Sequence, residues 1–402
     1  MKLPEISEVF KAQEVLKNVL VETPVTGPTK LSDKCEVYLK AECLQLTGSF
    51  KLRGAYYKIS QLTDEEKKRG VIACSAGNHA QGVALGATHN GIKSLICLPT
   101  TAPLSKVEAT KGFGADICIV EGVYDDAYKK AIELKEEFGY TFIHPFNDPL
   151  VIAGQGTIGL EIIRQLPEVE AVVVPVGGGG LISGVAFAIK TLRPDIKVYG
   201  VQAEGAPSMK TSLDRDKIVC LEKVRTIADG ISVKEPGDLT FEMCRNYVDQ
   251  VVTVSDDEIA AAILTLMEKQ KMVSEGAGAV SLAAVLFNKL PVEGKKVVCI
   301  ISGGNIDVNI LNRAITRGLV KSGRVVALTF ELTDRPGPLA DISRIISELG
   351  GNVISVIHER TSSFTDINSC LLHIEMETRN LEHVNEIKQK LEEAGYPILK
   401  SY

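Results

Sequence analysis

The sequence lacks an excess of positive charge. Its 402 residues contain 45 Lys and Arg against 51 Asp and Glu, so the formal net charge is -6. Proteins that bind DNA or RNA usually neutralise the phosphates with a basic patch or stripe. We therefore expect no nucleic-acid partner.

The sequence also lacks disulfide, zinc-ribbon and membrane patterns. Its nine cysteines form no C-x-x-C pair, and such scattered cysteines are typical of reduced, buried thiols in the cytoplasm. No apolar run approaches the ~20 residues that cross a bilayer, and the segment MKLPEISEVFKAQEVLKN has no apolar signal-peptide core. We expect a cytoplasmic protein with no disulfide, no metal site and no membrane contact.

Short apolar runs alternate with segments of helical periodicity from Val71 to Val320. The runs are VIACS, SLICLP, ICIVE, AVVVPV, KVYGVQ and KKVVCIIS. This alternation is typical of parallel strands that crossover helices bury on both faces. The predicted fold class is α/β. Because open α/β sheets bind ligands in the loops after their strands, we expect the chemistry in those loops.

The pattern changes after the basic helical stretch NRAITRGLVKSG. From Arg324 onward the order is strand (RVVALTFEL), helix (ADISRIISELG), strand (NVISVIHE), strand (SCLLHIEME), helix (LEHVNEIKQKLEEAG) and strand (YPILKS). This β-α-β-β-α-β order is ferredoxin-like. We predict a first domain over residues 1–322 and a second over residues 323–402.

One lysine lies where a helical pattern begins, in the segment SFKLRGA at Ser49 to Ala55. Taken alone, Lys51 is most simply an exposed surface charge, because charged side chains are mostly exposed. Its importance depends on the motifs that accompany it.

An apolar strand runs into four consecutive glycines and then a helix, in AVVVPVGGGGLISG. Gly177 to Gly180 let successive backbone N–H groups converge on an anion, and the helix N-terminus adds partial positive charge. The dinucleotide fingerprint is not met, because Ile182 and Ser183 stand where its last glycine would fall, and no segment matches the P-loop or the G-x-S-x-G elbow. We predict a phosphate site, with a flexible turn as the alternative.

Two further strand ends carry small polar residues. In CSAGNHAQG, the residues Ser75, Asn78 and His79 and the free amides of a helix start can hold a carboxylate. Read alone, this segment is a helix N-cap. In IISGGN, Ser302 leaves a strand end, and this segment read alone is a turn.

Together these four segments resemble the serine/threonine dehydratase family of fold type II pyridoxal-phosphate enzymes. The resemblance runs from about Val21 to Gly323 and includes ETPV, HPF, AGQGT, IADG and SEGAGA. It implies two open α/β subdomains, the smaller one at roughly residues 50–147 inserted in the larger. It also implies removal of water and ammonia from L-threonine, and from L-serine.

The same resemblance implies which residues bind the cofactor, pyridoxal 5'-phosphate. Lys51 would carry it covalently and act as the base at the substrate Cα, while Phe50 lies against it. Asn78 would contact the ring hydroxyl, and Ser302 the pyridine nitrogen. The phosphate would be held by Gly177, Gly178, Gly179, Gly180 and Leu181.

By resemblance, the substrate carboxylate would bind at Ser75, Asn78 and His79. Threonine and serine differ by one methyl group, which is worth ~1–3 kcal/mol in a pocket. No residue that senses this difference is evident in the sequence. The ranking of the two substrates, and a biosynthetic or a degradative role, stay open.

The alternatives are a serine racemase, another fold type II pyridoxal-phosphate enzyme, and a binding protein without catalysis; synthases of the cysteine or tryptophan type are less similar around Lys51. Serine racemases resemble the same motifs but have a second serine where this chain has Ala76, and the missing hydroxyl favours elimination over racemisation. Relatives that bind a divalent metal have an acidic side chain where Lys210 stands, which argues against magnesium, while a monovalent cation stays open. A binding protein that has lost the chemistry is disfavoured by the intact Lys51 and Ser302.

The C-terminal segment resembles an ACT domain, chiefly through TDRPGPLADISRIISELGGNV. Asp334, Pro336 and Gly337 lie on a turn before a helix, and the glycine pair at 350–351 would end that helix as a C-cap. The resemblance implies a small effector, an amino acid or a nucleotide, bound between paired domains. We expect a homo-oligomer, either a dimer or a tetramer. A dimerisation module without a ligand is the alternative.

Overall fold

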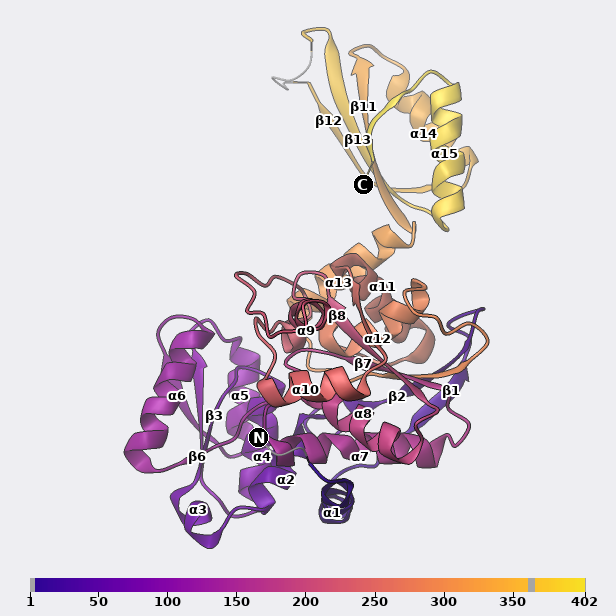
Figure 1. The fold of residues 1–402 in the computed structure, drawn as a ribbon. Coiled ribbons are helices and arrows are strands. Elements are labelled where there is room, and N and C mark those ends of the chain that lie inside the picture. The colour runs from indigo at the N-terminus through magenta and orange to yellow at the C-terminus, as the bar shows by residue number, and fades with distance from the viewer. Residues whose placement is uncertain (1–3, 361–365, 402) are drawn as a thin grey trace. The chain divides into compact units, whose positions relative to one another are not determined.

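The structure is a computed structural model that describes residues 4–360 and 366–401. The chain divides into two compact units, Met1–Leu311 and Asn312–Tyr402 (Figure 1). The predicted domain limit at residue 322 and the subdomain limits near residues 50 and 147 stay predictions. The α/β class and the ferredoxin-like C-terminal order are confirmed.

The larger sheet of the first unit has, in its described residues, the strand order β1-β2-β10-β7-β8-β9. All neighbours are parallel except β1, which pairs antiparallel with β2 at one edge. The strands are β1 (Val25–Thr29), β2 (Glu36–Lys40), β7 (Ala171–Pro175), β8 (Lys197–Ala203), β9 (Gln250–Val254) and β10 (Lys296–Ile300). The associated helices are α1 (Ile6–Leu16), α7 (Pro149–Gln165), α8 (Gly180–Leu192), α9 (Ser208–Asp214), α10 (Asp238–Tyr247), α11 (Asp256–Thr265), α12 (Gly276–Leu286) and α13 (Val308–Lys321).

The smaller sheet of the same unit is wholly parallel, in the order β5-β4-β3-β6. Its strands are β3 (Val71–Cys74), β4 (Ser94–Pro99), β5 (Asp116–Val120) and β6 (Thr141–Phe142). The helices of this part are α2 (Lys51–Ser60), α3 (Asp64–Arg69), α4 (Asn78–His89), α5 (Leu104–Gly112) and α6 (Tyr124–Phe138). Short helical turns of the unit are η1 (Glu42–Leu44), η2 (Asp229–Ile231) and η3 (Leu266–Gln270).

The six predicted apolar runs coincide with β3, β4, β5, β7, β8 and β10. Every residue of β3 and β7 is buried, as expected for strands covered on both faces. Four further strands of this unit, β1, β2, β6 and β9, lie outside these runs. Strand β1 is a half-exposed edge strand that contains Gly27 and Pro28, and β6 is only two residues long, so neither forms an apolar run.

Helix α7 packs against α2 on one side and α8 on the other through close contacts at glycines. A Cβ added at Gly54 of α2 would lie 2.6 Å from the Val151 carbonyl oxygen, and one at Gly154 of α7 would lie 2.7 Å from the Gly54 Cα. A Cβ at Gly184 of α8 would meet the Ile152 carbonyl oxygen at 2.3 Å. The glycines of SFKLRGA and AGQGT are therefore explained by backbone packing that has no room for a side chain.

A group of buried charges joins α2, α7 and the end of β2. The Arg53 guanidinium donates to both carboxylate oxygens of Glu42 at 2.8 Å and to the two of Glu161 at 2.6 and 2.9 Å. The Lys40 ammonium donates to Glu161 at 2.5 Å. Arg53, Glu42 and Lys40 are 0% exposed, so these charges depend on one another and not on water.

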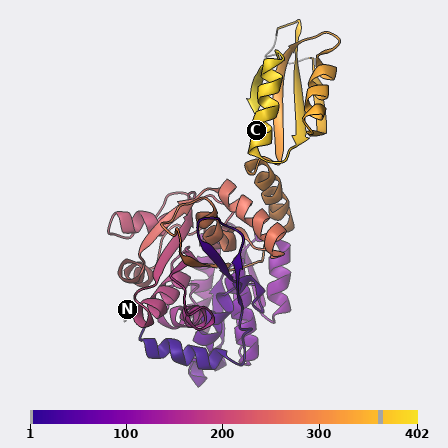
Figure 2. The same ribbon diagram turned by 90° about the vertical axis from the view of Figure 1, so that its right-hand side faces the viewer.

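The second unit contains β11 (Val325–Thr333), α14 (Pro338–Glu348), β12 (Asn352–Glu359), β13 (Ser369–Glu377), α15 (Leu381–Glu393) and β14 (Ile398–Ser401). Its sheet is antiparallel in the order β12-β13-β11-β14, and α14 and α15 lie on the same face of it (Figure 2). Side chains from β11, β13 and both helices form a separate core, which includes Phe330, Ile346 and Ile387.

Seven of the nine cysteines are buried. All nine cysteines are free, and only Cys220 is exposed. None of the helices in the described residues combines the length and the apolar character needed to cross a membrane.

The buried charges yield the first prediction. Arg53→Met should lower the free energy of unfolding by ~3–5 kcal/mol, because it leaves the buried Glu42 carboxylate without its guanidinium partner and Glu161 with Lys40 alone. Urea denaturation of the full-length protein, followed by circular dichroism, measures the change. The control is Arg193→Met, which removes an exposed ion pair with Asp195 and should leave unfolding unchanged. An Arg53→Met protein as stable as the wild type would contradict the prediction.

Candidate active site

Lys51 is the first residue of α2, and it is positioned by the segment that follows β10. The Phe50 N–H donates to the Ser302 carbonyl at 3.1 Å, and Ser49 forms a bridge with Gly303. The Lys51 ammonium donates to the Pro145 carbonyl at 3.0 Å and lies 5.4 Å from the centre of the Phe50 ring. The two predicted segments SFKLRGA and IISGGN therefore lie side by side.

Burial lowers the pKa of Lys51 to about 8, and the nearby Glu275 carboxylate opposes this shift. A lysine in water has a pKa near ~10.4 and is almost wholly charged at neutral pH. At neutral pH a larger fraction of Lys51 is therefore the neutral amine, which is the form that acts as a nucleophile or a base.

The four glycines form the turn between β7 and α8. Gly179 has φ +98°, in the left-handed region that side chains disfavour, and it is the N-cap of α8. A Cβ at Gly178 would lie 2.4 Å from the Phe146 ring, and one at Gly179 would lie 2.7 Å from Thr240. Tight packing on the protein side of the loop therefore requires residues without side chains.

Several backbone N–H groups of this loop are available as hydrogen-bond donors. In the described residues, the N–H groups of Gly178, Gly179 and Gly180 have no protein acceptor, whereas the Gly178 carbonyl is taken by the Thr240 hydroxyl at 2.6 Å. A turn that offers N–H groups at a helix N-terminus suits an anion with several acceptor oxygens. The loop therefore fits the phosphate group of pyridoxal phosphate.

A short turn at residues 144–147 connects Lys51 with the glycine loop. His144 Nδ1 accepts the N–H groups of Phe146 and Asn147 at 3.2 and 2.8 Å, and this bonding fixes the turn. Burial, together with the charge of Lys51, lowers the pKa of His144 to about 4, so its ring stays neutral and can accept. Pro145 then faces the Lys51 ammonium, and Phe146 packs on the glycines.

The start of α4 carries the residues predicted for the substrate carboxylate. Ser75 is half-buried, and its hydroxyl accepts the Gly77 N–H at 3.2 Å. His79 is buried, and its Nε2 bonds to the Ile143 carbonyl at 2.8 Å, which engages one nitrogen of its ring. Burial and the charge of Lys51 lower the pKa of His79 to about 3. The predicted role of these residues stays a prediction.

The Asn78 side chain is held by two side chains from distant segments of the chain. Its Nδ2 donates to Glu275 Oε1 at 2.7 Å, and its Oδ1 accepts from Asn305 Nδ2 at 2.8 Å. Asn305 also donates to the Thr47 carbonyl at 2.7 Å. Asn78 is thus fixed in one orientation near Lys51.

Glu275 belongs to the site but had no role in the sequence analysis. Burial raises the pKa of its carboxyl to about 7, with a further contribution from Asp229. A buried carboxyl with a strongly shifted pKa near a lysine whose pKa is also shifted is a common feature of catalytic sites. The segment SEGAGA marked this position, but nothing in its spacing pointed to Lys51.

Ser302 is buried two residues after the end of β10, and its hydroxyl donates to the Ala277 carbonyl at 3.5 Å, which is a weak bond. Lys210, considered above against a divalent metal, pairs with Asp214 at 2.8 Å. The roles of Phe50, Leu181 and Ser302 toward a cofactor stay predictions.

Comparison with known proteins agrees with this geometry. A family model described as "Pyridoxal-phosphate dependent enzyme" matches residues 17–303, and one described as "ACT domain" matches residues 322–395. An L-threonine ammonia-lyase of Thermotoga maritima is 53% identical over 395 residues, which cover 98% of each chain.

Two solved structures are also similar to most of this chain. The processed form of threonine deaminase isoform 2 from Solanum lycopersicum matches with a TM-score of 0.74 and 40% identity, over 78% of this chain and 94% of that one. Maize serine racemase matches with a TM-score of 0.74 and 37% identity, over 80% of this chain and 99% of that one. The chain therefore belongs to the family of pyridoxal-phosphate dependent enzymes, together with the L-threonine ammonia-lyases, and carries a C-terminal ACT domain.

Proposed function

We propose that this protein is an L-threonine ammonia-lyase, which converts L-threonine to 2-oxobutanoate and ammonia and also converts L-serine to pyruvate. The observation that carries the proposal is the half-buried Lys51, whose amine is joined to the glycine loop by the turn at Pro145 and Phe146. The high identity to the Thermotoga maritima L-threonine ammonia-lyase along the whole chain supports the choice of substrate.

Lys51 would serve as both anchor and base. When bound, pyridoxal phosphate supplies an aldehyde for amines and a ring that accepts electrons. With the substrate bound in its place, the free Lys51 amine would take the Cα proton of the substrate. The lowered pKa of Lys51 favours this role, because a base must be neutral to accept a proton.

The residues around Lys51 would fix the reactants. The free N–H groups at the start of α4, with the Ser75 hydroxyl, suit the substrate carboxylate. Asn78, held by Glu275 and Asn305, is oriented to meet the ring hydroxyl of the cofactor. Loss of the β-hydroxyl, followed by hydrolysis, gives the 2-oxo acid and ammonia.

Ser302 would favour elimination over transamination. Ser302 is buried and would offer an uncharged hydroxyl to the ring nitrogen, which would not hold that nitrogen protonated as a carboxylate would. Ser302 would therefore favour prompt loss of the hydroxyl group from Cβ over a long-lived carbanion.

A second candidate activity is serine racemisation, which the similarity to maize serine racemase supports. Racemisation needs a second acid or base on the face of Cα opposite Lys51. This chain has Ala76 in the loop after β3, where the racemases would have a serine. We therefore assign elimination as the main reaction.

We also propose that the ACT domain controls the enzyme by binding an amino acid or a nucleotide, and that the protein is a dimer or a tetramer. The second unit has a hydrophobic core of its own, which supports its role as a separate regulatory module. Effectors of such modules act by favouring one of two states of the protein.

The function is tested first at Lys51. Lys51→Ala should abolish formation of 2-oxobutanoate from threonine and of pyruvate from serine, because no other amine is placed to replace it. Borohydride reduction of the wild type followed by peptide mass mapping should find the cofactor on Lys51. Lys58→Ala, on the same helix but paired with Asp148, should keep both activity and label. A label on another lysine would refute the site, and a correct label without turnover of either amino acid would refute the substrate.

The second test concerns Ala76. Ala76→Ser should add formation of D-serine from L-serine without abolishing elimination, because it supplies a hydroxyl for the opposite face of Cα. Chiral chromatography measures the product, with Ala76→Gly as a variant that changes size without adding a hydroxyl. No D-serine above the wild-type level would mean that Ala76 is not what suppresses racemisation.

The third test removes the regulatory domain. A chain that ends at Lys321 should fold and stay active, because the first unit contains both α/β sheets and every proposed catalytic residue. In the full-length enzyme an effector should shift the apparent KM for threonine ~5- to 150-fold, which corresponds to a coupling of ~1–3 kcal/mol. Truncation should erase this shift. Kinetics with branched-chain amino acids and adenine nucleotides measure it, and a response that survives truncation would place the effector on the first unit.

A further inference from the structure

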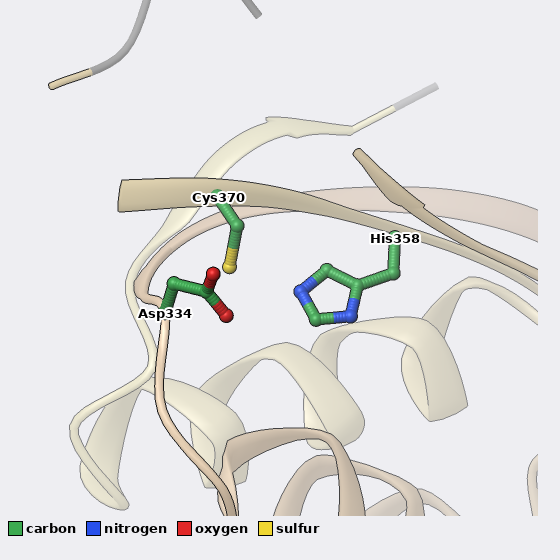
Figure 3. A group of neighbouring side chains, drawn as sticks. All are labelled: Asp334, His358 and Cys370. Atoms are coloured by element: carbon green, nitrogen blue, oxygen red, sulfur yellow. The ribbon is translucent and has the colours of Figure 1, made fainter. Parts of the chain in front are cut away.

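Three side chains of the second unit, distant in sequence, meet at one end of its sheet. Asp334 directly follows β11, His358 lies in β12, and Cys370 lies in β13. A carboxylate oxygen, a ring nitrogen and the sulfur of these residues all lie within 4.8 Å of one another (Figure 3).

The register of the sheet explains this meeting. Strand β13 lies between β11 and β12, with Cys370 opposite Leu332 and Leu372 opposite His358. Side chains two residues apart on a strand share a face, so Cys370 and Leu372 face the same side, and their partners face it with them. The Asp334 N–H bonds to the Asn368 carbonyl at 2.9 Å, which keeps Asp334 in line with β11.

The chemistry of the three groups is that of a transition-metal site. A thiolate, an imidazole and a carboxylate are the ligands that zinc accepts, whereas calcium and magnesium prefer oxygen alone. With bonds of ~2.0–2.3 Å, the ligand atoms of a tetrahedral zinc site lie ~3.5 Å apart. The Asp334 and His358 side chains are exposed, so they can close the remaining distance, while Cys370 is buried and stays in place.

The surroundings leave room for a fourth ligand. The three residues line a cavity of about 620 Å³ that also borders the start of α14. Arg360 faces the same cavity, and its Nε lies 3.3 Å from an Asp334 carboxylate oxygen. A cation at the site would compete with this guanidinium for Asp334.

We propose that Asp334, His358 and Cys370 bind a divalent transition-metal ion such as zinc, with the fourth position open to the cavity. The ion would join the ends of β11, β12 and β13. The proposal concerns the second unit alone and does not depend on the reaction at Lys51.

Cobalt(II) tests the proposal directly, because its thiolate complexes absorb in the near ultraviolet. Difference spectra of full-length protein, prepared with its cofactor, should show this band and saturate at one cobalt per chain. Zinc should displace the cobalt and abolish the band. Cys370→Ser should remove the band, and Cys220→Ser, a matched change at an exposed cysteine, should keep it.

Two further variants separate metal binding from folding. His358→Gln changes an exposed side chain and should weaken zinc binding at least ~10-fold, since even the loss of an outer partner of a metal ligand costs ~10–100-fold. Arg360→Ala should bind zinc as tightly as the wild type or more tightly, because the competing guanidinium is gone. Competition with a chromophoric chelator measures both affinities.

The proposal is wrong if the wild type binds no cobalt or zinc with a stoichiometry of one. It is also wrong if the band persists in Cys370→Ser, because another cysteine would then be the ligand. Unchanged zinc affinity in His358→Gln, or weaker binding in Arg360→Ala, would contradict the assigned ligands.

Discussion

The catalytic unit depends on one buried arginine. Arg53 and Lys51 are two residues apart at the start of α2, and on a helix such residues project to nearly opposite sides. Arg53 is held on one side by Glu42 and Glu161, which come from η1 and α7. Lys51 is thereby directed to the other side, toward Pro145 and the proposed substrate. Because its partners are buried, this anchor resists rotation of the helix far more than an exposed ion pair would.

The same exclusion of water sets the acid and base properties of the site. Burial lowers the pKa of Lys51 to about 8 and raises the pKa of Glu275 to about 7, so both groups titrate near neutral pH. Their mutual attraction opposes both shifts without removing them. The neutral rings of His79 and His144 add no charge and serve as hydrogen-bond partners of fixed backbone groups. A site of this kind can exchange protons near neutral pH.

The second unit follows a different plan. Its helices and sheet enclose a core of their own, and no residue proposed for catalysis belongs to it. Its cavity lies beside the turn that precedes α14, where Asp334 meets side chains from two other strands. Every residue that lines this cavity belongs to the second unit, and a ligand site distinct from the catalytic residues is what allosteric control of a reaction requires.

The sequence by itself determined the local features. The apolar runs specified six strands of the α/β unit, and the order of strand and helix patterns after Arg324 specified the ferredoxin-like unit. The glycines at 177–180 pointed to an anion site. These follow from residue type and spacing along the chain. Only the tertiary structure decided which residues meet. Glu275 beside Asn78, Arg53 between Glu42 and Glu161, and Cys370 beside Asp334 and His358 are contacts between distant segments. Spacing along the chain carries no trace of them, because strand register and helix packing alone bring such side chains together.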